Sequence, residues 1–398
     1  MIAEPSVSLA SDPARTRGRL HKTDDSPTRS EFQRDRDRVI HSTAFRRLQH
    51  KTQVFLAHEG THFRTRLTHT LEVSQIARAI SRSLGLNEDL AEAVALTHDL
   101  GHTPFGHAGE RALHRCMEGA DGFDHNMQAI RVVTRIENRY AEHDGLNLTW
   151  EVIEGILKHN GPMTDPAGNP VGRYKEHGLP FGIHDEIASA DLMLHTHASL
   201  EAQAAAIADD LAYNAHDVDD ALRAGLLTLD DLIEAPLIGP IVKEVRARYP
   251  DVPVKRQAHE VIRRLITRTI ENVIATSAAR IADAGITTAD EARHAGRTLI
   301  GFDIEMAERE KQLKSFLFAR VYRHDDVMRH VRVAEEIVER LFRSYAGGDP
   351  MPGRWGEAFE RTSGTTRLRV ISDFVAGMTD PFALSEYTRL FDLRPDFG

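Results

Sequence analysis

The chain has 398 residues, of which 41% are hydrophobic and 28% are charged, a composition typical of a globular protein large enough for two subdomains. The formal net charge of −10 argues against general adhesion to nucleic acid, although it is compatible with a local basic pocket. The single cysteine excludes an intramolecular disulfide and a thiolate zinc cluster, and it fits a reducing, cytoplasmic setting. We expect no signal peptide and no membrane span, because no run of about 18 apolar residues occurs.

The first helices are predicted from residue 31 onward. Residues 1–30 are rich in Ser, Pro, Thr, Asp and Arg without periodicity, which predicts a largely flexible segment. The stretch LTHTLEVSQIARAISRSLGL then shows an apolar helical face made of Leu67, Leu71, Ile76, Ile80 and Leu84. Gly85 is expected to end this helix.

The next helix is expected to begin after Asn87, which is a good N-cap residue, and to run through EDLAEAVALTHDL to Gly101. Pro104 and Gly106 then predict a turn before HAGERALHRCM resumes helical spacing.

The remaining two thirds of the chain also favour helices. TWEVIEGILKHNG predicts a helix closed by Gly161, and the Gly- and Pro-rich stretch after it predicts a loop. A long helix follows over HASLEAQAAAIADDLAYNAHDVDDALRAG, and the last third alternates helical segments such as VRVAEEIVERLFRSYAG. Strand-like alternation is scarce, so we predict an all-α fold.

The stretch ALTHDLGHTPFGH, residues 95–107, concentrates three histidines and an aspartate among apolar and small residues. His98 and His102 share a helix face only if the helix continues through Gly101. At a helix end, however, neighbouring side chains such as His98 and Asp99 can converge on one ion. Imidazole and carboxylate together suit a divalent cation, which requires further ligands from elsewhere in the chain.

Two other helices supply candidates for those ligands. His69 lies in RTRLTHTLEV, and Asp209 and Asp210 lie in a helix otherwise rich in Ala and Ile. Adjacent acids on an apolar helix are costly to bury unless they are paired or bind a metal. Each residue alone is weak evidence, but the order H…HD…D across several helices is a strong pattern.

This pattern resembles the HD-domain phosphohydrolases, and among them the deoxyguanosinetriphosphate triphosphohydrolase-like family of dNTPases. The similarity covers roughly residues 15–395 and includes HSTAFRRLQHKTQVF, FDHNMQA, LKHNGP, ADDLAYNAHDVDDAL and ISDFVAGMTD. It implies an HD-domain helical core over residues 31–235 and a C-terminal helical phosphohydrolase-associated region over 236–398. The implied reaction is metal-dependent hydrolysis of dGTP, and of other dNTPs, at the α-phosphorus to deoxynucleoside and inorganic triphosphate.

The resemblance implies one divalent metal ion, with Mg or Mn favoured and Fe, Co, Ni or Zn also compatible. The implied ligands are His69, His98, Asp99 and Asp209. We choose Asp209 over Asp210 because Tyr213 and Asp217 follow it at i+4 and i+8, on one helix face. In the family a tyrosine and an acid at these positions contact the sugar and the site.

The implied catalytic residues are His107, Glu110, His125 and His102. His107 matches the family's in-line histidine, Glu110 is placed to orient it, and His102 matches a residue that contacts phosphate or water. The departing 5′-oxygen needs a proton, but sequence leaves open whether His107 acts as acid or nucleophile.

Further matches concern the substrate. Arg66 matches the family's phosphate-binding arginine, and Gln53 resembles the glutamine that recognises the sugar 3′-hydroxyl. The basic residues Lys51, Arg46, Arg47 and Arg64 are candidates for the β- and γ-phosphates. Two positions depart from the family pattern: Pro381 stands where many relatives carry a basic residue, and Asp210 where some carry a lysine.

Two other interpretations stay open. The first is another HD enzyme, a nucleotidase or a cyclic-nucleotide phosphodiesterase, in which His102 or His125 would bind a second ion. The second is a catalytically inactive regulator that binds nucleotides or single-stranded nucleic acid; the net charge and the 6% aromatic content disfavour it, although weak single-strand affinity is compatible with them. The resemblance also implies a homo-oligomer, either a dimer, tetramer or hexamer. Base preference and an allosteric nucleotide site are left open.

Overall fold

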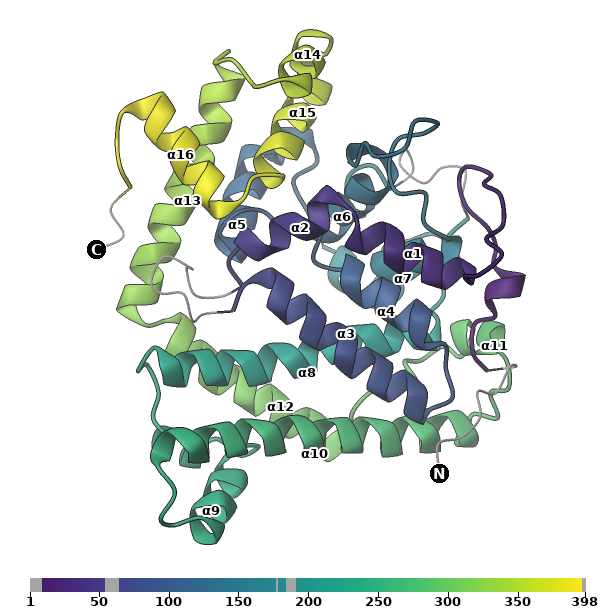
Figure 1. Ribbon diagram of the computed structural model, residues 1–398, viewed down its shortest axis with the longest axis vertical. Coiled ribbons are helices and arrows are strands. Elements are labelled where there is room, and N and C mark those ends of the chain that lie inside the picture. Colours follow the sequence, from purple (N-terminus) through teal and green to yellow (C-terminus); the bar gives the residue numbers. More distant parts are fainter. Residues whose placement is uncertain (1–8, 54–63, 177, 184–190, 396–398) are drawn as a thin grey trace.

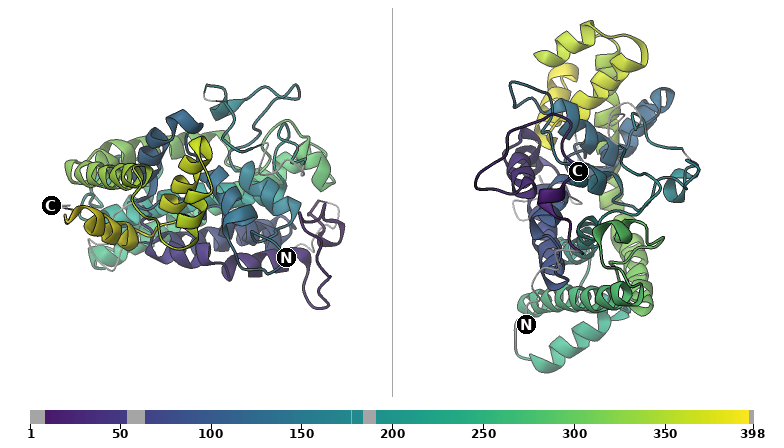
Figure 2. Two further views of the ribbon diagram at one scale, coloured as in Figure 1. Left: turned by 90° about the horizontal axis from the view of Figure 1, so that it is seen from above. Right: turned by 90° about the vertical axis from the view of Figure 1, so that its right-hand side faces the viewer.

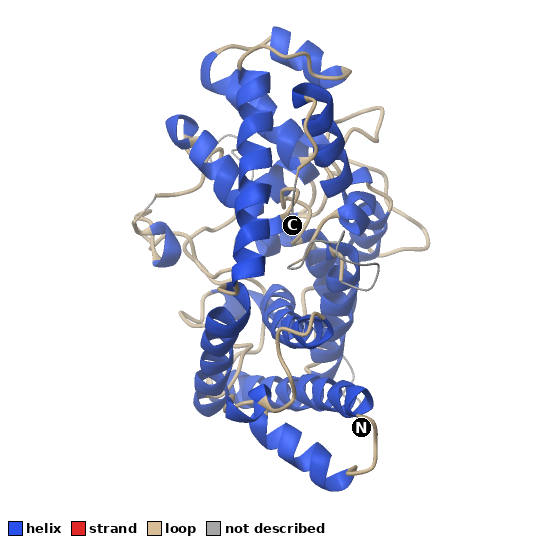
Figure 3. Cartoon of the chain, turned by 90° about the vertical axis from the view of Figure 1, so that its left-hand side faces the viewer, coloured by secondary structure: helices blue, strands red, loops and turns tan. Residues whose placement is uncertain are grey.

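Helices are the only regular secondary structure in the computed structural model, which describes residues 9–53, 64–176, 178–183 and 191–395 (Figure 1 and Figure 3). Extended pairing within these ranges is limited to isolated bridges, such as the one between Arg19 and Thr149. The prediction of an all-α fold is therefore confirmed. No helix of this described part is both long and apolar enough to cross a membrane.

Within the described residues, the first part of the chain, up to Arg223, forms eight α-helices. They are α1 (Glu31–Ile40), α2 (Thr43–Arg47), α3 (Arg66–Ser83), α4 (Glu88–Thr97), α5 (Gly106–Cys116), α6 (His125–Arg131), α7 (Trp150–Leu157) and α8 (Leu200–Arg223). Short 3₁₀ turns lie between them at η1 (Pro13–Arg15), η2 (Leu48–His50), η4 (Glu118–Ala120) and η6 (Gly172–Tyr174), and a π-helical turn, η5 (Val132–Ile136), extends α6.

The described residues after Arg223 form eight more α-helices. They are α9 (Gly239–Arg248), α10 (Val254–Asp283), α11 (Ala289–Arg293), α12 (Ile304–Leu317), α13 (Asp325–Ala346), α14 (Arg354–Glu360), α15 (Gly364–Ala376) and α16 (Asp380–Phe391). A 3₁₀ turn, η7 (Asp231–Glu234), precedes α9, and a π-helical turn, η8 (Phe318–Tyr322), follows α12. The molecule is elongated, with α9 and α10 at one end and α14 at the other (Figure 1 and Figure 2).

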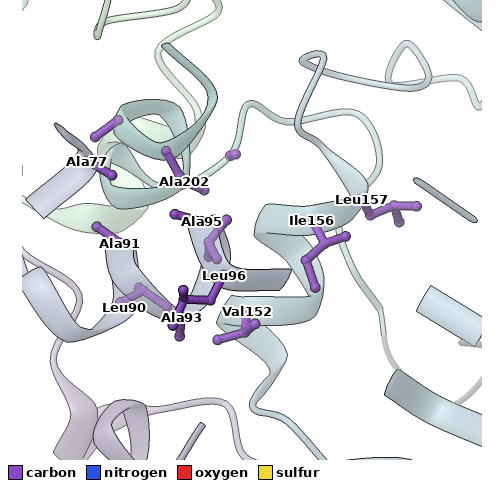
Figure 4. Packing of buried hydrophobic residues seen from close by; sticks show 14 of the residues in the cluster. Ala77, Leu90, Ala91, Ala93, Ala95, Leu96, Val152, Ile156, Leu157 and Ala202 are labelled. Atoms are coloured by element: carbon purple, nitrogen blue, oxygen red, sulfur yellow. The ribbon is translucent and has the colours of Figure 1, made fainter. Parts of the chain in front are cut away.

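Helix α4 lies at the centre of the first half, packed against α1, α3, α7 and α8. Small side chains make this close approach possible: Ala91 and Ala95 of α4 lie near Ala77 of α3 and Ala202 of α8 (Figure 4). Four helices around a small-residue helix bury its C-terminal end, and that end carries the His-Asp pair.

The C-terminal helices pack directly on helices of the first half. One apolar cluster joins α5 to α13, α15 and α16, and another joins the C-terminal half of α8 to α9, α10 and α12. Residues 31–235 and residues 236–398 therefore share hydrophobic cores. Helices α5 and α8 of the 31–235 part make these shared contacts.

The segment before α1 differs from the flexible chain expected from its composition. Within the described residues, the Ser11 amide and hydroxyl both donate to the Glu201 carboxylate, at 2.8 and 3.0 Å. Arg19 bonds to Glu31 and to the buried Asp35. Ser11 contacts α8 and Arg19 contacts α1, so the composition of residues 1–30 alone could not predict these contacts.

Two details of the predicted helices need correction. Leu71 is 49% exposed, because His69, Thr70 and Val73 take the buried face of α3. The second helix ends at Thr97 rather than at Gly101. The ends at Gly85, which has a positive φ of 68°, and at Asn87, whose side chain accepts the Leu90 amide, are confirmed.

Candidate metal centre and catalytic cluster

The end of α4 presents two neighbouring side chains to one point. His98 follows the last helical residue and Asp99 lies in the turn that continues to Gly101. Because the helix stops here, His98 and His102 do not share a continuous helix face, and His98 and Asp99 converge instead. The His98 Nε2 and Asp99 Oδ1 atoms are 3.4 Å apart.

Helices α3 and α8 bring two more donors to the same point. His69 Nε2 lies 2.9 Å from Asp209 Oδ1, and His98 Nε2 lies 3.5 Å from that oxygen. Donor atoms of His69, His98 and Asp99 all lie within 4.8 Å of one another. The four residues predicted as metal ligands are thus brought together by three helices.

Two buried atoms in this group, His98 Nε2 and Asp99 Oδ2, have no hydrogen-bond partner among the residues that the structure describes. The other nitrogen of His98, Nδ1, donates to the Ala95 carbonyl at 2.6 Å, which leaves the Nε2 lone pair facing the group. Buried polar atoms are costly unless something binds them. Two imidazole nitrogens and two carboxylates are a donor set that fits one divalent cation.

The electrostatics of the group point the same way. Burial lowers the pKa of His98, but the Asp99 and Asp209 carboxylates outweigh it and raise that pKa to about 9. Burial raises the pKa of Asp99, but Arg66 and His98 outweigh it and hold that pKa well below its ordinary value. A site that stabilises positive charge this strongly suits a metal ion, which competes with the proton for the same nitrogen.

Arg66, the first residue of α3, faces Asp99 from the other side. Its guanidinium donates to Asp99 Oδ1 at 2.9 Å and is 2% exposed. Its Nε atom has no hydrogen-bond partner, so donor capacity remains next to the metal group. The position is the one predicted for a phosphate-binding arginine.

A second cluster gathers His102, His107, Glu110 and His125 beside the first. Glu110 accepts from His107 Nδ1 at 3.0 Å and from His125 Nδ1 at 2.7 Å. The rings of His102 and His125 stack with centroids 4.2 Å apart, and His102 Nε2 lies 3.2 Å from Asp99 Oδ1. His102 therefore joins this cluster to the metal group.

The pKa values of the residues in this cluster are shifted in different directions. Burial raises the pKa of Glu110, but His125 and His107 outweigh it and hold that pKa well below its ordinary value. Burial lowers the pKa of His125, but the Glu110 carboxylate outweighs it and raises that pKa. Burial and the Arg66 charge lower the pKa of His102 well below its ordinary value. The surroundings therefore favour the charged form of Glu110, the protonated form of His125 and the neutral form of His102.

The predicted sugar-binding residues lie on the same side of α8. The Tyr213 ring is edge-on to His69, with centroids 6.4 Å apart. Asp217, one turn further, is 1% exposed, and its Oδ2 has no partner. Burial and the neighbouring Asp220 raise the pKa of Asp217 well above its ordinary value.

Gln53 reaches the site from the chain before α3. A Cβ placed on Gly106 would lie 3.3 Å from the Gln53 carbonyl oxygen and 3.1 Å from the Arg66 guanidinium, which puts Gln53 beside the start of α5. The side-chain oxygen of Gln53 is buried without a partner.

The basic residues expected at the β- and γ-phosphates are placed differently. Lys51 is 2% exposed and donates to the carbonyls of His102 and Ala376, so its side-chain nitrogen supports the turn around His102 from inside. Arg64 donates to Asp219 and Asp220, at 2.8 and 2.9 Å.

The other two basic candidates also lie outside the metal group. Exposed Arg46 donates to the His41 carbonyl and to Thr43. Arg47 lines a separate cavity of about 270 Å³ together with Arg354 and Trp355. Within the described residues, Arg46, Arg47 and Arg64 make no hydrogen bond or ion pair to the four predicted ligands.

Asp380, the residue before Pro381, contacts the backbone near the site. Pro381 occupies the first turn of α16, where its missing N–H costs nothing. Asp380 is buried and accepts from the Thr52 amide at 2.9 Å and from the Phe105 amide at 2.9 Å. Phe105 has a positive φ of 61°, so Asp380 holds the strained turn that begins α5.

Three residues near the metal group were given no role in the sequence-based prediction. His159, after α7, lies with Nε2 3.4 Å from Asp209 Oδ2 and stacks on His98. His159 comes just after a helix and before an Asn-Gly-Pro turn, as His98 comes at the end of its helix. That similarity in the sequence could have indicated His159 as a site residue. His216 and Glu72 lie behind His69, and nothing in their spacing distinguished them from other helical residues.

Gly101 is required by the close approach of α6. A Cβ at this position would lie 2.0 Å from the His125 carbonyl oxygen and 2.3 Å from the Ala129 amide nitrogen. Both neighbours are backbone atoms, so α6 would have to move and take His125 with it. We expect Gly101→Ala to destabilise the fold by about 1–3 kcal/mol and to lower hydrolytic activity as well.

Denaturant unfolding and a hydrolysis assay measure the two effects. Gly119→Ala is the matched control, because nothing lies within 4 Å of its added Cβ. Equal stability and activity in both variants would show that the turn tolerates the displacement.

An all-helical fold that brings His69, His98, Asp99 and Asp209 together is typical of the HD-domain hydrolases. A model of the HD domain matches residues 66–214, and a model of the phosphohydrolase-associated domain matches residues 300–389. These matches cover the helices that hold the metal group and the C-terminal helices packed on α5.

Full-length relatives specify the family further. The chain is 55% identical to deoxyguanosinetriphosphate triphosphohydrolase-like protein 1 of Mesorhizobium japonicum, over 99% of this chain and 97% of the relative. Proteins described as deoxyguanosinetriphosphate triphosphohydrolase-like from Bradyrhizobium diazoefficiens and Brucella ovis are 54% and 53% identical, over 99% and 98% of this chain and 98% and 96% of theirs. The chain therefore belongs to the deoxyguanosinetriphosphate triphosphohydrolase-like family of HD-domain phosphohydrolases.

Proposed function

We propose that this protein hydrolyses deoxynucleoside triphosphates at the α-phosphorus and releases deoxynucleoside and inorganic triphosphate. One observation carries the proposal: His69, His98 and Asp99, with Asp209 beside them, form a group that could hold a divalent cation, and this group is joined to the His–Glu–His cluster through Asp99 and His102 at 3.2 Å. The relatives are described as deoxyguanosinetriphosphate triphosphohydrolase-like proteins, which favours dGTP among the substrates.

The cation would be held by His69, His98, Asp99 and Asp209, with Mg or Mn the first choices and Fe, Co, Ni or Zn also compatible with the donors. When bound there, a divalent cation supplies Lewis-acid polarisation of a phosphoryl oxygen. Arg66, already positioned at Asp99, would bind the same phosphate. Such charge is needed locally, because the protein as a whole is acidic.

The reaction makes one bond and breaks one. An oxygen of water becomes bonded to the α-phosphorus, the bond from that phosphorus to the 5′-oxygen breaks, and the 5′-oxygen takes a proton. His125 holds a proton against Glu110, and the more exposed His107 shares the same carboxylate. His107 and His125 therefore offer a proton donor for the leaving 5′-oxygen. If His107 acts as a nucleophile instead, the reaction with labelled dNTP would leave a labelled phosphohistidine on His107.

The sugar would lie along α8. Tyr213 provides a flat side chain next to His69, and Asp217 provides a buried carboxyl group one turn further along the helix. Gln53 offers an unpartnered amide oxygen from the opposite side of the site, which suits a 3′-hydroxyl.

A two-metal phosphodiesterase is the second candidate, because donor atoms of His102, His107 and Glu110 also lie within 4.8 Å of one another. Both oxygens of Glu110, however, are already engaged by His107 and His125. This arrangement favours proton transfer over a second cation.

The test is product analysis by anion-exchange chromatography. Purified protein is incubated with each of the four dNTPs, alone and mixed, with Mg or Mn, and Asp99→Ala is run alongside. Deoxynucleoside plus intact triphosphate, absent in the variant, is the expected result. Monophosphate plus pyrophosphate, or no turnover of any single dNTP or of the mixture, would contradict the proposal.

A further inference from the structure

A row of three side chains leads from the metal group toward the surface behind His69. His69 and Glu72 lie one turn apart on α3, and His216 comes from α8. His69 Nδ1 lies 3.1 Å from His216 Nδ1, and His216 Nε2 contacts the Glu72 carboxylate. His69 and His216 are 1% and 2% exposed, so the link between them is shielded from water.

Only one arrangement of protons satisfies every contact in this row while His69 binds a cation. A metal ligand needs its Nε2 lone pair free, so a neutral His69 carries its proton on Nδ1 and donates it to His216. The Nδ1 atom of His216 is then an acceptor, and its proton lies on Nε2. That N–H needs an acceptor, and the Glu72 carboxylate is the one in contact with it.

The carboxylate at the end of the row is itself held in place. Arg64 Nε lies 3.5 Å from Glu72 Oε2, and the same guanidinium donates to Asp219 and Asp220 of α8. Arg64 thus ties Glu72 to the helix that carries His216. This contact accounts for an arginine near the site that does not reach the four predicted ligands.

The other histidine of the metal group is fixed differently. His98 donates Nδ1 to the Ala95 carbonyl one turn earlier, a backbone contact that no substitution removes. The orientation of His69 depends instead on the side chains of His216 and Glu72. Partners of this kind orient a ligating histidine and select its tautomer.

We propose that His216 and Glu72 are positioning residues, which fix the tautomer and orientation of His69 and thereby set the affinity for the divalent cation. The inference rests on the proposed metal site. It assigns no contact with substrate to either residue.

The experiment measures Mn²⁺ binding to the metal-free full chain by calorimetry, without nucleotide. We expect Glu72→Ala and His216→Phe each to weaken Mn²⁺ binding by about 10- to 100-fold. His216→Gln is expected to keep more affinity than His216→Phe, because its amide oxygen can accept from His69 while its amide nitrogen donates to Glu72. Glu88→Ala is the matched control, since Glu88 is a partly exposed, arginine-paired glutamate on α4.

Two further measurements separate the possible outcomes. Thermal unfolding without metal should be similar in wild type and Glu72→Ala, whereas the rise in Tm on adding Mn²⁺ should shrink in the variant. Glu72 has a 43% exposed side chain, so its variant carries the test even if His216→Phe fails to fold. Wild-type Mn²⁺ affinity in Glu72→Ala, or equal losses in His216→Gln and His216→Phe, would overturn the inference.

Asp209→Asn, measured in parallel, distinguishes failure of the inference from failure of the proposed site. If Asp209→Asn binds Mn²⁺ like wild type, the metal site itself is wrong. If Asp209→Asn loses Mn²⁺ while Glu72→Ala and His216→Phe retain it, only the positioning role is contradicted.

Discussion

Asp209→Asn is expected to reduce hydrolysis by about 10²- to 10⁴-fold, the effect of losing several kcal/mol of cation-assisted stabilisation. Asp209 contacts three histidines of the site, His69, His98 and His159, through its two oxygens. Replacing one oxygen by an amide nitrogen removes an anionic donor and places an N–H donor among them. Activity at saturating Mn²⁺ and calorimetric Mn²⁺ binding together measure the change.

Asp210→Asn is the matched control for that substitution. Asp210 is adjacent in sequence, but its side chain is 52% exposed and pairs with Lys314 at 2.8 Å. We expect this variant to keep near-wild-type activity and Mn²⁺ affinity. Equal losses in both variants would show that the acidic pair acts through the stability of α8 rather than through a cation.

Glu110→Gln is expected to lower kcat by about 10²- to 10⁴-fold while leaving Mn²⁺ affinity close to that of wild type. The Glu110 carboxylate accepts from both His107 and His125 and raises the pKa of His125. A neutral amide removes that charge, so burial is left to lower the pKa of His125. An acid loses its proton as pH rises through its pKa, and the activity limb that falls with rising pH should therefore move to lower pH.

The measurement is kcat as a function of pH, with Mn²⁺ binding determined on the same samples. Glu335→Gln is a suitable control, because Glu335 of α13 pairs with Arg111 and Arg115 on the outer side of α5. A fall in Mn²⁺ affinity that matches the fall in kcat would contradict the proton-transfer role. It would assign Glu110 to cation binding, as the two-metal alternative requires.

Local sequence patterns were sufficient for much of the fold and for the candidate ligands. Asn87 caps α4 as its position predicted, and Asp209, Tyr213 and Asp217 follow one another along α8. Apolar periodicity failed at Leu71, because polar His69 and Thr70 occupy the buried face that a hydrophobicity pattern would assign to leucine.

Local sequence patterns could not predict the contacts that complete the site. His69 and His216 are 147 positions apart, and the Thr52–Asp380 contact joins residues 328 positions apart. Lys51 illustrates the consequence: its charge suggested a phosphate ligand, but its ammonium bonds to the carbonyls of His102 and Ala376.

The sequence by itself determined that this is an all-helical protein, because helix periodicity and caps are set by neighbouring residues, and its motifs resemble those of a family in which such His and Asp residues share a cation. Only the tertiary structure decided which partners orient those residues, which arginines are already paired, and how the C-terminal helices hold the catalytic turn. Those outcomes depend on helices meeting across a buried core, where a side chain's partner is chosen by packing and by the cost of leaving a polar group unpaired.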